Sequence, residues 1–133
     1  MPDHDEKVAQ LVSAAAKDER VLALLLFGSR ARGDATRFSD VDLCVVLDPT
    51  RSDAGTAAAV KLAYLDTTPG AFDIQVYQNL PIYVRKRVLA EGRVLYCRDD
   101  DALYELARCT IREFEDFRPR YQHYLDEVAR AGP

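Results

Sequence analysis

Residues 21–47 read VLALLLFGSRARGDATRFSDVDLCVVL, and this stretch decides the fold. Val21–Phe27 is a continuous apolar run, which predicts a strand buried on both faces. Gly28 ends the run, and a polar, glycine-containing stretch follows over residues 29–40. Val41–Leu47 is the next apolar run and predicts a second strand. A buried strand and a second strand therefore flank a polar stretch.

The rest of the chain continues an alternation of helices and strands. Apolar spacing and turn residues predict helices over residues 5–17, 50–65, 81–90 and 100–131, a short helix at Arg30–Gly33, and strands over 72–77 and 93–97. In the strand Phe72–Tyr77, alternation predicts Asp73, Gln75 and Tyr77 on the polar face. Pro119 is expected to kink or divide the last helix. The fold class is a small mixed α/β (α+β) domain with about four strands.

Length and charge limit what this domain does. The 133 residues make one domain, 1–133, with enough apolar content (48%) to build a core. With 18 basic and 22 acidic side chains the net charge is -4, which argues against strong nucleic-acid binding because such binding depends on clustered Lys and Arg. No apolar run is long enough to cross a membrane, and the acidic start MPDHDEK does not resemble a signal peptide.

The cysteines indicate a reducing compartment. Cys44, Cys97 and Cys109 are odd in number, and no two of them form a CxxC pair. This pattern favours reduced, buried thiols over a disulfide framework or a zinc site. We therefore expect a cytoplasmic protein.

One constellation carries chemistry: Gly28-Ser29 after the first strand and Asp40-Val41-Asp42 at the start of the second. Residues i and i+2 of a strand point to the same face, so the two carboxylates should project together and offer the oxygen ligands that Mg²⁺ prefers. Gly28 lets the backbone approach a phosphate closely, and the Ser29 hydroxyl can donate to phosphate oxygens.

Three further side chains complete the predicted site. Arg30 and Arg32 add charge-assisted donors for phosphate. Asp73 lies on the polar face of the third strand, and a neighbouring strand could bring it beside the first two carboxylates. Three carboxylates allow two metal ions, one that lowers the pKa of an attacking hydroxyl and one that stabilises the triphosphate. The sequence therefore predicts nucleotidyl transfer from a nucleoside triphosphate with two Mg²⁺ ions, with Asp40, Asp42 and Asp73 as catalytic metal ligands.

At these residues the chain resembles the DNA polymerase β-type nucleotidyltransferase superfamily. The string GSRARGDATRFSDVDL is similar to its minimal nucleotidyltransferase (MNT) branch, as are the stretches LPIYVRKRVLAEGRVLYCRD and TIREFEDFRPRY. The resemblance implies a palm-like nucleotidyltransferase fold. It also implies that Gly28 and Ser29 hold the triphosphate, that Asp40 and Asp42 bind metal, and that Asp73 is the third acidic residue.

The resemblance also implies a partner. MNT proteins commonly pair with HEPN proteins, which are helical ribonuclease toxins, and act as antitoxins by moving AMP from ATP onto a toxin tyrosine. The roughly 35 residues after Cys97 are too few for a substrate domain, so the acceptor is expected on a partner protein.

Alternatives to this reading stay open. The chain could neutralise a toxin by binding alone, or it could modify a small molecule such as an aminoglycoside. The aromatic stripe of the last helix, 100–131, fits either core packing or partner binding (Phe114, Phe117, Tyr121, Tyr124).

Overall fold

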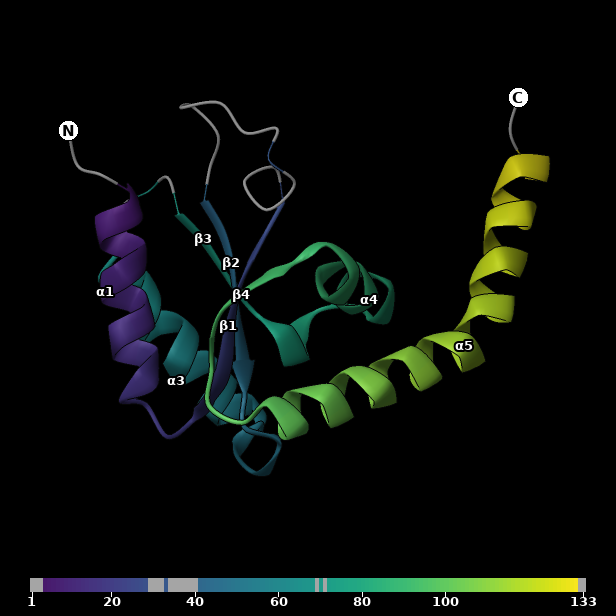
Figure 1. Cartoon of the computed structure of the whole chain (residues 1–133). Helices are drawn as coiled ribbons and strands as arrows, with labels where there is room; N and C mark the ends of the chain where they lie inside the picture. Colours follow the sequence, from purple (N-terminus) through teal and green to yellow (C-terminus); the bar gives the residue numbers. More distant parts are fainter. Residues whose placement is uncertain (1–3, 29–32, 34–40, 69, 71, 132–133) are drawn as a thin grey trace.

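The computed structural model describes residues 4–28, 33, 41–68, 70 and 72–131. Along the chain it contains α1 (His4–Ala16), β1 (Val21–Phe27), β2 (Val41–Leu47), the 3-10 turn η1 (Pro49–Arg51), α3 (Ala54–Leu65), β3 (Phe72–Val76), the 3-10 turn η2 (Tyr77–Asn79), α4 (Ile82–Glu91), β4 (Arg93–Cys97) and α5 (Asp100–Ala131) (Figure 1). The predicted alternation of helices and strands is confirmed. The predicted short helix at 30–33 falls outside the described residues except at Gly33.

The four strands form one mixed sheet in the order β3-β2-β1-β4. β1 pairs antiparallel with both β2 and β4, whereas β2 and β3 run parallel. Parallel neighbours need a crossover connection, and α3 supplies it between β2 and β3. The predicted four-stranded α/β domain is therefore confirmed.

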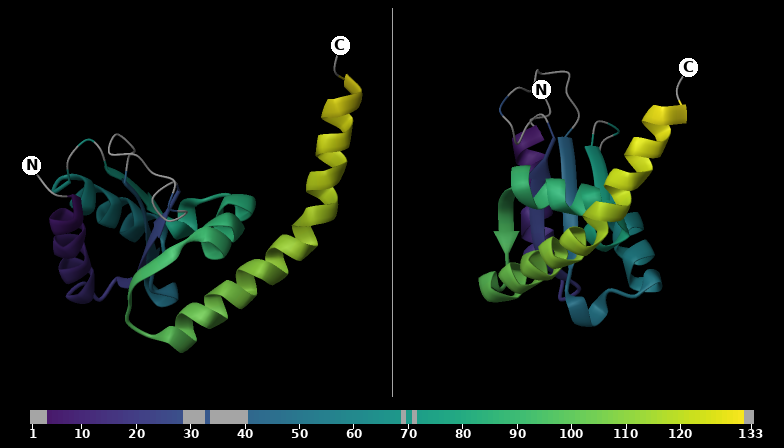
Figure 2. Two further views of the ribbon diagram at one scale, coloured as in Figure 1. Left: turned by 45° about the horizontal axis from the view of Figure 1, so that its top comes forward. Right: turned by 90° about the vertical axis from the view of Figure 1, so that its right-hand side faces the viewer.

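Each face of the sheet packs against a different pair of helices. α1 and α3 cover one face, where Leu11 of α1 and Val60 of α3 pack against side chains of β1, β2 and β3. α4 and the first half of α5 cover the other face, through Val88, Leu103 and their neighbours (Figures 1 and 2). Because strand residues alternate between faces, β1 is buried on both sides, as predicted, and β2 is buried on both sides except at Asp42.

The helices predicted over 5–17 and 81–90 are each displaced by one residue, and two other predicted elements have bounds that are wrong for a physical reason. The helix predicted over 50–65 begins at Ala54, because the Asp53 carboxylate accepts from the Thr56 N–H at 3.0 Å and caps α3 there. The strand predicted over 72–77 ends at Val76. Tyr77 instead begins η2, and it is buried rather than on a polar face.

Helix α5 is long and bent. Its 32 residues contain Pro119, and the helix changes direction where it passes from green to yellow in Figure 1, so it is kinked but not divided. Its first turn is capped by Asp99, whose carboxylate accepts from the Ala102 N–H at 3.2 Å. No helix within the described residues has both the length and the apolar character needed to span a membrane.

The three cysteines are free thiols, but their burial differs. Cys44 is fully buried on β2, and burial raises the pKa of its thiol. Cys97 is half-buried and Cys109 is exposed. The prediction of buried thiols is therefore wrong for Cys109, which lies on the solvent side of α5.

A buried hydrogen bond connects α5 to η2, the turn that follows β3. The hydroxyls of Tyr77 and Thr110 lie 2.5 Å apart, and both residues are almost inaccessible. Burial raises the pKa of Tyr77, which keeps its hydroxyl protonated and able to donate. The bond fixes the middle of α5 on the α4 face of the sheet.

We predict that Tyr77→Phe lowers the free energy of unfolding by about 1–3 kcal/mol, because the Thr110 hydroxyl is left buried without its partner. The double variant Tyr77→Phe/Thr110→Val should recover part of this loss. Urea denaturation measures both. Tyr124→Phe, at a tyrosine that is 62% exposed, is the control and should change stability by less than about 0.5 kcal/mol. Equal effects at the two tyrosines would contradict the prediction.

Candidate active site

The site begins where β1 ends, at Gly28. Gly28 has φ +76°, a backbone conformation that disfavours side chains. A Cβ atom at this position would also lie 2.3 Å from Oδ2 of Asp42. Two independent constraints therefore require glycine here, and the Asp42 carboxylate packs directly against the turn.

Asp42 and Asp73 are adjacent across the sheet. In the parallel pairing of β2 with β3, Asp42 is the register partner of Asp73. Asp42 lies two residues before Cys44, which packs beneath α4 and α5, so alternation places Asp42 on that face. Neighbouring strands are about 4.8 Å apart, which is close enough for two carboxylates to share a cation.

The Asp73 carboxylate has a hydrogen-bond partner on its own strand. Gln75 Nε2 donates to Asp73 Oδ1 at 3.0 Å. The sequence placed Gln75 on the same face as Asp73 but did not suggest this role. The only feature of the sequence that is consistent with this hydrogen bond is the i, i+2 spacing of Asp73 and Gln75.

The structure brings together three of the seven residues predicted for the site: Gly28, Asp42 and Asp73. Ser29, Arg30, Arg32 and Asp40 lie outside the described residues. Among the residues described, no group of three or more His, Cys, Asp or Glu side chains is arranged to hold a metal ion. The two paired carboxylates nevertheless offer the hard oxygen donors that suit Mg²⁺.

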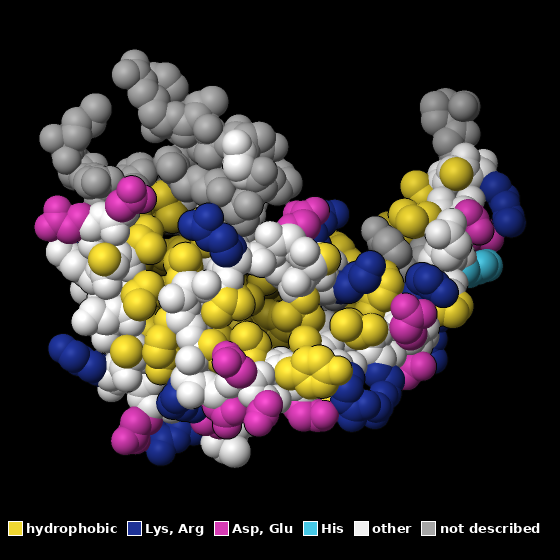
Figure 3. Space-filling view, viewed as in Figure 1, with side chains coloured by type: hydrophobic (Ala, Val, Ile, Leu, Met, Phe, Trp, Pro, Cys, Tyr) yellow, Lys and Arg dark blue, Asp and Glu magenta, His cyan; other side chains and the backbone are white. Residues whose placement is uncertain are grey.

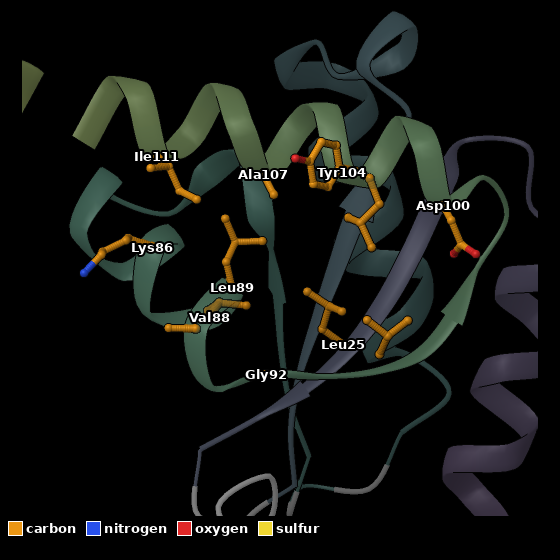
Figure 4. Close-up of a pocket in the computed structure, with 12 residues that line it drawn as sticks. Leu25, Lys86, Val88, Leu89, Gly92, Asp100, Tyr104, Ala107 and Ile111 are labelled. Carbon is orange, nitrogen blue, oxygen red and sulfur yellow. The ribbon is translucent and has the colours of Figure 1, made fainter. Parts of the chain in front are cut away.

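Sequence reasoning did not predict an apolar groove on the same face of the sheet. The groove has a volume of about 400 Å³ and lies between α4, β4 and the first half of α5, where Val94, Tyr104 and Ile111 form part of its wall. Lys86 and Asp100 stand at its opposite ends in Figure 4, and Figure 3 shows a hollow of hydrophobic side chains on this side of the molecule. The three wall residues are 48–69% exposed.

A mixed sheet that ends in a glycine turn beside paired carboxylates is typical of proteins that act on nucleotide phosphates with a divalent metal. Residues 9–101, well over half of the chain, match the family model "Polymerase beta, Nucleotidyltransferase". The chain belongs to this nucleotidyltransferase family. Gly28, Asp42 and Asp73 all fall within the matched region.

A curated relative is similar over part of its length. It is "Putative protein adenylyltransferase MJ1547" of Methanocaldococcus jannaschii, which is 27% identical over 77 residues. These residues are 58% of this chain and 57% of the relative, so the match spans little more than half of either protein.

Solved structures share the fold over nearly the whole chain. A chain of a toxin–antitoxin crystallised with AMP-PNP has a TM-score of 0.66 at 22% identity, covering 93% of this chain and 97% of that one. A chain of the tri-AMPylated HEPN toxin in complex with MNT antitoxin, from Shewanella oneidensis, has a TM-score of 0.66 at 17% identity, covering 93% and 94%. At these identities the likeness shows the fold.

We predict that Gly28→Ala destabilises the chain by at least about 1 kcal/mol more than Gly33→Ala, measured by urea denaturation. Both glycines have positive φ, +76° and +82°, so both alanines introduce backbone strain. A Cβ at Gly33 meets nothing within 4 Å, whereas a Cβ at Gly28 collides with Asp42. The difference therefore isolates the collision. Equal losses from the two substitutions would show that Asp42 does not pack against the turn.

Proposed function

We propose that this chain is a Mg²⁺-dependent protein adenylyltransferase that moves AMP from ATP onto a hydroxyl, that of a tyrosine, on a helical HEPN toxin, and so acts as its antitoxin. The observation that carries the proposal is the register pairing of Asp42 with Asp73 beside the Gly28 turn. Similar to this chain are a protein named "Putative protein adenylyltransferase MJ1547" and a chain of a complex between a tri-AMPylated HEPN toxin and an MNT antitoxin.

The proposed reaction is a displacement at the α-phosphorus of ATP. The acceptor oxygen forms a bond to this phosphorus as the bond to pyrophosphate breaks, and the hydroxyl proton passes to one of the site carboxylates. Asp40, Asp42 and Asp73 would hold the metal ions. When bound, Mg²⁺ lowers the pKa of the attacking hydroxyl and stabilises the charge of the triphosphate.

The phosphate side of the site is assigned to the Gly28 turn and the segment that follows it. Glycine at position 28 allows the positive φ of this turn, and the Asp42 carboxylate occupies the space on its Cβ side. Ser29 would donate its hydroxyl to the triphosphate, and Arg30 and Arg32 would add charge-assisted donors as pyrophosphate leaves. These three assignments are made from the sequence.

We assign partner binding to α5, residues 100–131. Its first half is fastened to α4, because Arg85 pairs with Glu113 at 3.3 Å and the Lys86 ammonium lies 4.8 Å from the centre of the Phe114 ring. Its second half extends away from the sheet and the other helices in Figure 1 and in the left view of Figure 2. Ion pairs such as Arg118–Glu115 and Arg130–Glu127 connect residues of this half to each other.

The second half of α5 carries apolar side chains in solvent. Tyr124, Leu125 and Val128 are 62%, 40% and 52% exposed. Together with the apolar groove at Val94 and Tyr104, they give the molecule more exposed apolar surface than scattered single residues account for. An amphipathic helix of this kind suits packing against a helical partner.

This surface also favours a second candidate function, neutralisation by binding alone. An antitoxin that covers its toxin with α5 would need no chemistry at Asp42 and Asp73. The two functions differ in what the carboxylates do, so substitution of the carboxylates separates them.

The catalytic proposal is tested with ATP labelled at the α-phosphate and a helical HEPN protein as the candidate acceptor. We expect label on the wild-type partner, and a loss of at least about 100-fold in Asp42→Asn and in Asp73→Asn because each removes one proposed metal-ligand charge. Asp53→Asn is the matched control, since Asn also caps a helix well and Asp53 lies at the start of α3.

Three outcomes of this experiment distinguish the candidate functions. Full labelling by both site variants would contradict the catalytic proposal. Neutralisation of the toxin that survives both substitutions would favour binding alone. Label found only on a small molecule, such as an aminoglycoside from a drug panel, would indicate a stand-alone enzyme instead.

The role of α5 has its own test. We predict that the double variant Leu125→Glu/Val128→Glu weakens binding of the HEPN protein at least tenfold, because it places two charges in the apolar contact. Binding of AMP-PNP should be unchanged, which isothermal titration measures in the same samples. Leu62→Glu on α3, a leucine that is 62% exposed, is the control. Unchanged partner affinity in the α5 variant would rule out this assignment.

A further inference from the structure

Gln75 is a polar side chain on a face of the sheet that is otherwise apolar at this level. It lies on β3 between Asp73 and Tyr77, and its register partner on β2 is Cys44. Cys44 and Tyr77 are both buried in the core that α4 and α5 cover. Gln75 is partly buried as a residue, whereas its amide bonds to Asp73 at an exposed position. Packing in the core therefore does not account for the amide end of this side chain.

The partner of the Gln75 amide is the candidate metal ligand Asp73. Nε2 of Gln75 donates to Oδ1 of Asp73 at 3.0 Å. The amide nitrogen is only a donor, so the bond restricts the rotation of the Asp73 carboxylate. The amide also has no net charge, so it leaves the negative charge of Asp73 available to a cation, which a lysine or arginine would partly neutralise.

The position of this bond is what gives it a function. Asp73 is the register partner of Asp42, and Gln75 stands one step further along the same face, on the side away from the Gly28 turn. The amide therefore contacts Asp73 from the side away from the Gly28 turn, while Asp42 lies next to Asp73 on the neighbouring strand. In metal sites, hydrogen bonds of this kind to a ligand typically change metal affinity by about 10–100-fold.

We infer that Gln75 is a positioning residue of the metal site: through its bond to Asp73 Oδ1 it fixes that carboxylate beside Asp42 and so strengthens binding of the divalent cation. The inference rests on the proposed function, because it requires that Asp42 and Asp73 hold a metal ion. It adds to that function a residue outside the set of carboxylates and phosphate-binding groups.

The test measures Mn²⁺ binding to the full chain by electron paramagnetic resonance in the presence of AMP-PNP. Gln75→Met keeps the length of the side chain and removes the donor, and we expect its Kd for Mn²⁺ to rise about tenfold. Gln75→Asn keeps the amide but shortens the side chain by one methylene, and it should show a similar rise.

Gln78→Met is the matched control. The Gln78 amide also bonds within the fold, accepting from the Leu47 N–H at 3.1 Å and donating to the Leu47 carbonyl at 3.0 Å, but at the far end of β2. We expect this variant to have a lower melting temperature and a Kd for Mn²⁺ within twofold of wild type. A loss of affinity confined to the Gln75 variants is not explained by general destabilisation.

The possible failures are distinguishable. Gln75→Met and Gln75→Asn chains that bind Mn²⁺ within twofold of a wild type with a saturable site would overturn the role of Gln75 and leave the proposed function intact. A wild-type chain with no saturable Mn²⁺ site would contradict the proposed function, and the role of Gln75 with it. Equal weakening in the Gln75 and Gln78 variants would reduce Gln75 to a structural residue.

Discussion

The close approach of the Gly28 backbone to the Asp42 side chain is the contact on which the site depends. It follows from the antiparallel pairing of β1 with β2, which makes Phe27 the register partner of Asp42 and puts the next residue against the carboxylate. A side chain at position 28 would occupy the space of Asp42 Oδ2. The missing Cβ thus allows the glycine turn and an acidic side chain to share one end of the sheet.

The topology of the sheet supplies the second carboxylate. β3 returns parallel to β2 after α3, so its first residues lie beside the first residues of β2, and Asp73 pairs with Asp42. The same alternation that buries Ile74 against α1 and α3 turns Asp73 and Gln75 toward the face of α4. The alternation of residues along the strand therefore positions both the core residue and the candidate site residues. Helix α5 begins on the face that carries the site and extends from it into solvent.

The sequence predicted what local patterns determine. β1, β2 and β4 have the predicted bounds because each is an apolar segment with glycine, proline or charged residues at its ends. Alternation also placed Asp73 on the correct face. Local patterns did not predict features that depend on contacts distant in sequence. Tyr77 is buried because it contacts Thr110 of α5. The pairing of Asp42 with Asp73 depends on the order of the strands in the sheet. The hydrogen bond from Gln75 to Asp73 could be identified only from the three-dimensional structure.

The central claim is that Asp42 and Asp73 bind one metal ion together. Anomalous diffraction from crystals of the chain grown with Mn²⁺ and AMP-PNP tests it most directly, because Mn²⁺ scatters anomalously and occupies Mg²⁺ sites. The account predicts an anomalous peak within coordination distance of both carboxylates, beside the Gly28 turn. A nucleotide-bound crystal with no such peak, or with a peak that only one of the two carboxylates reaches, would contradict it.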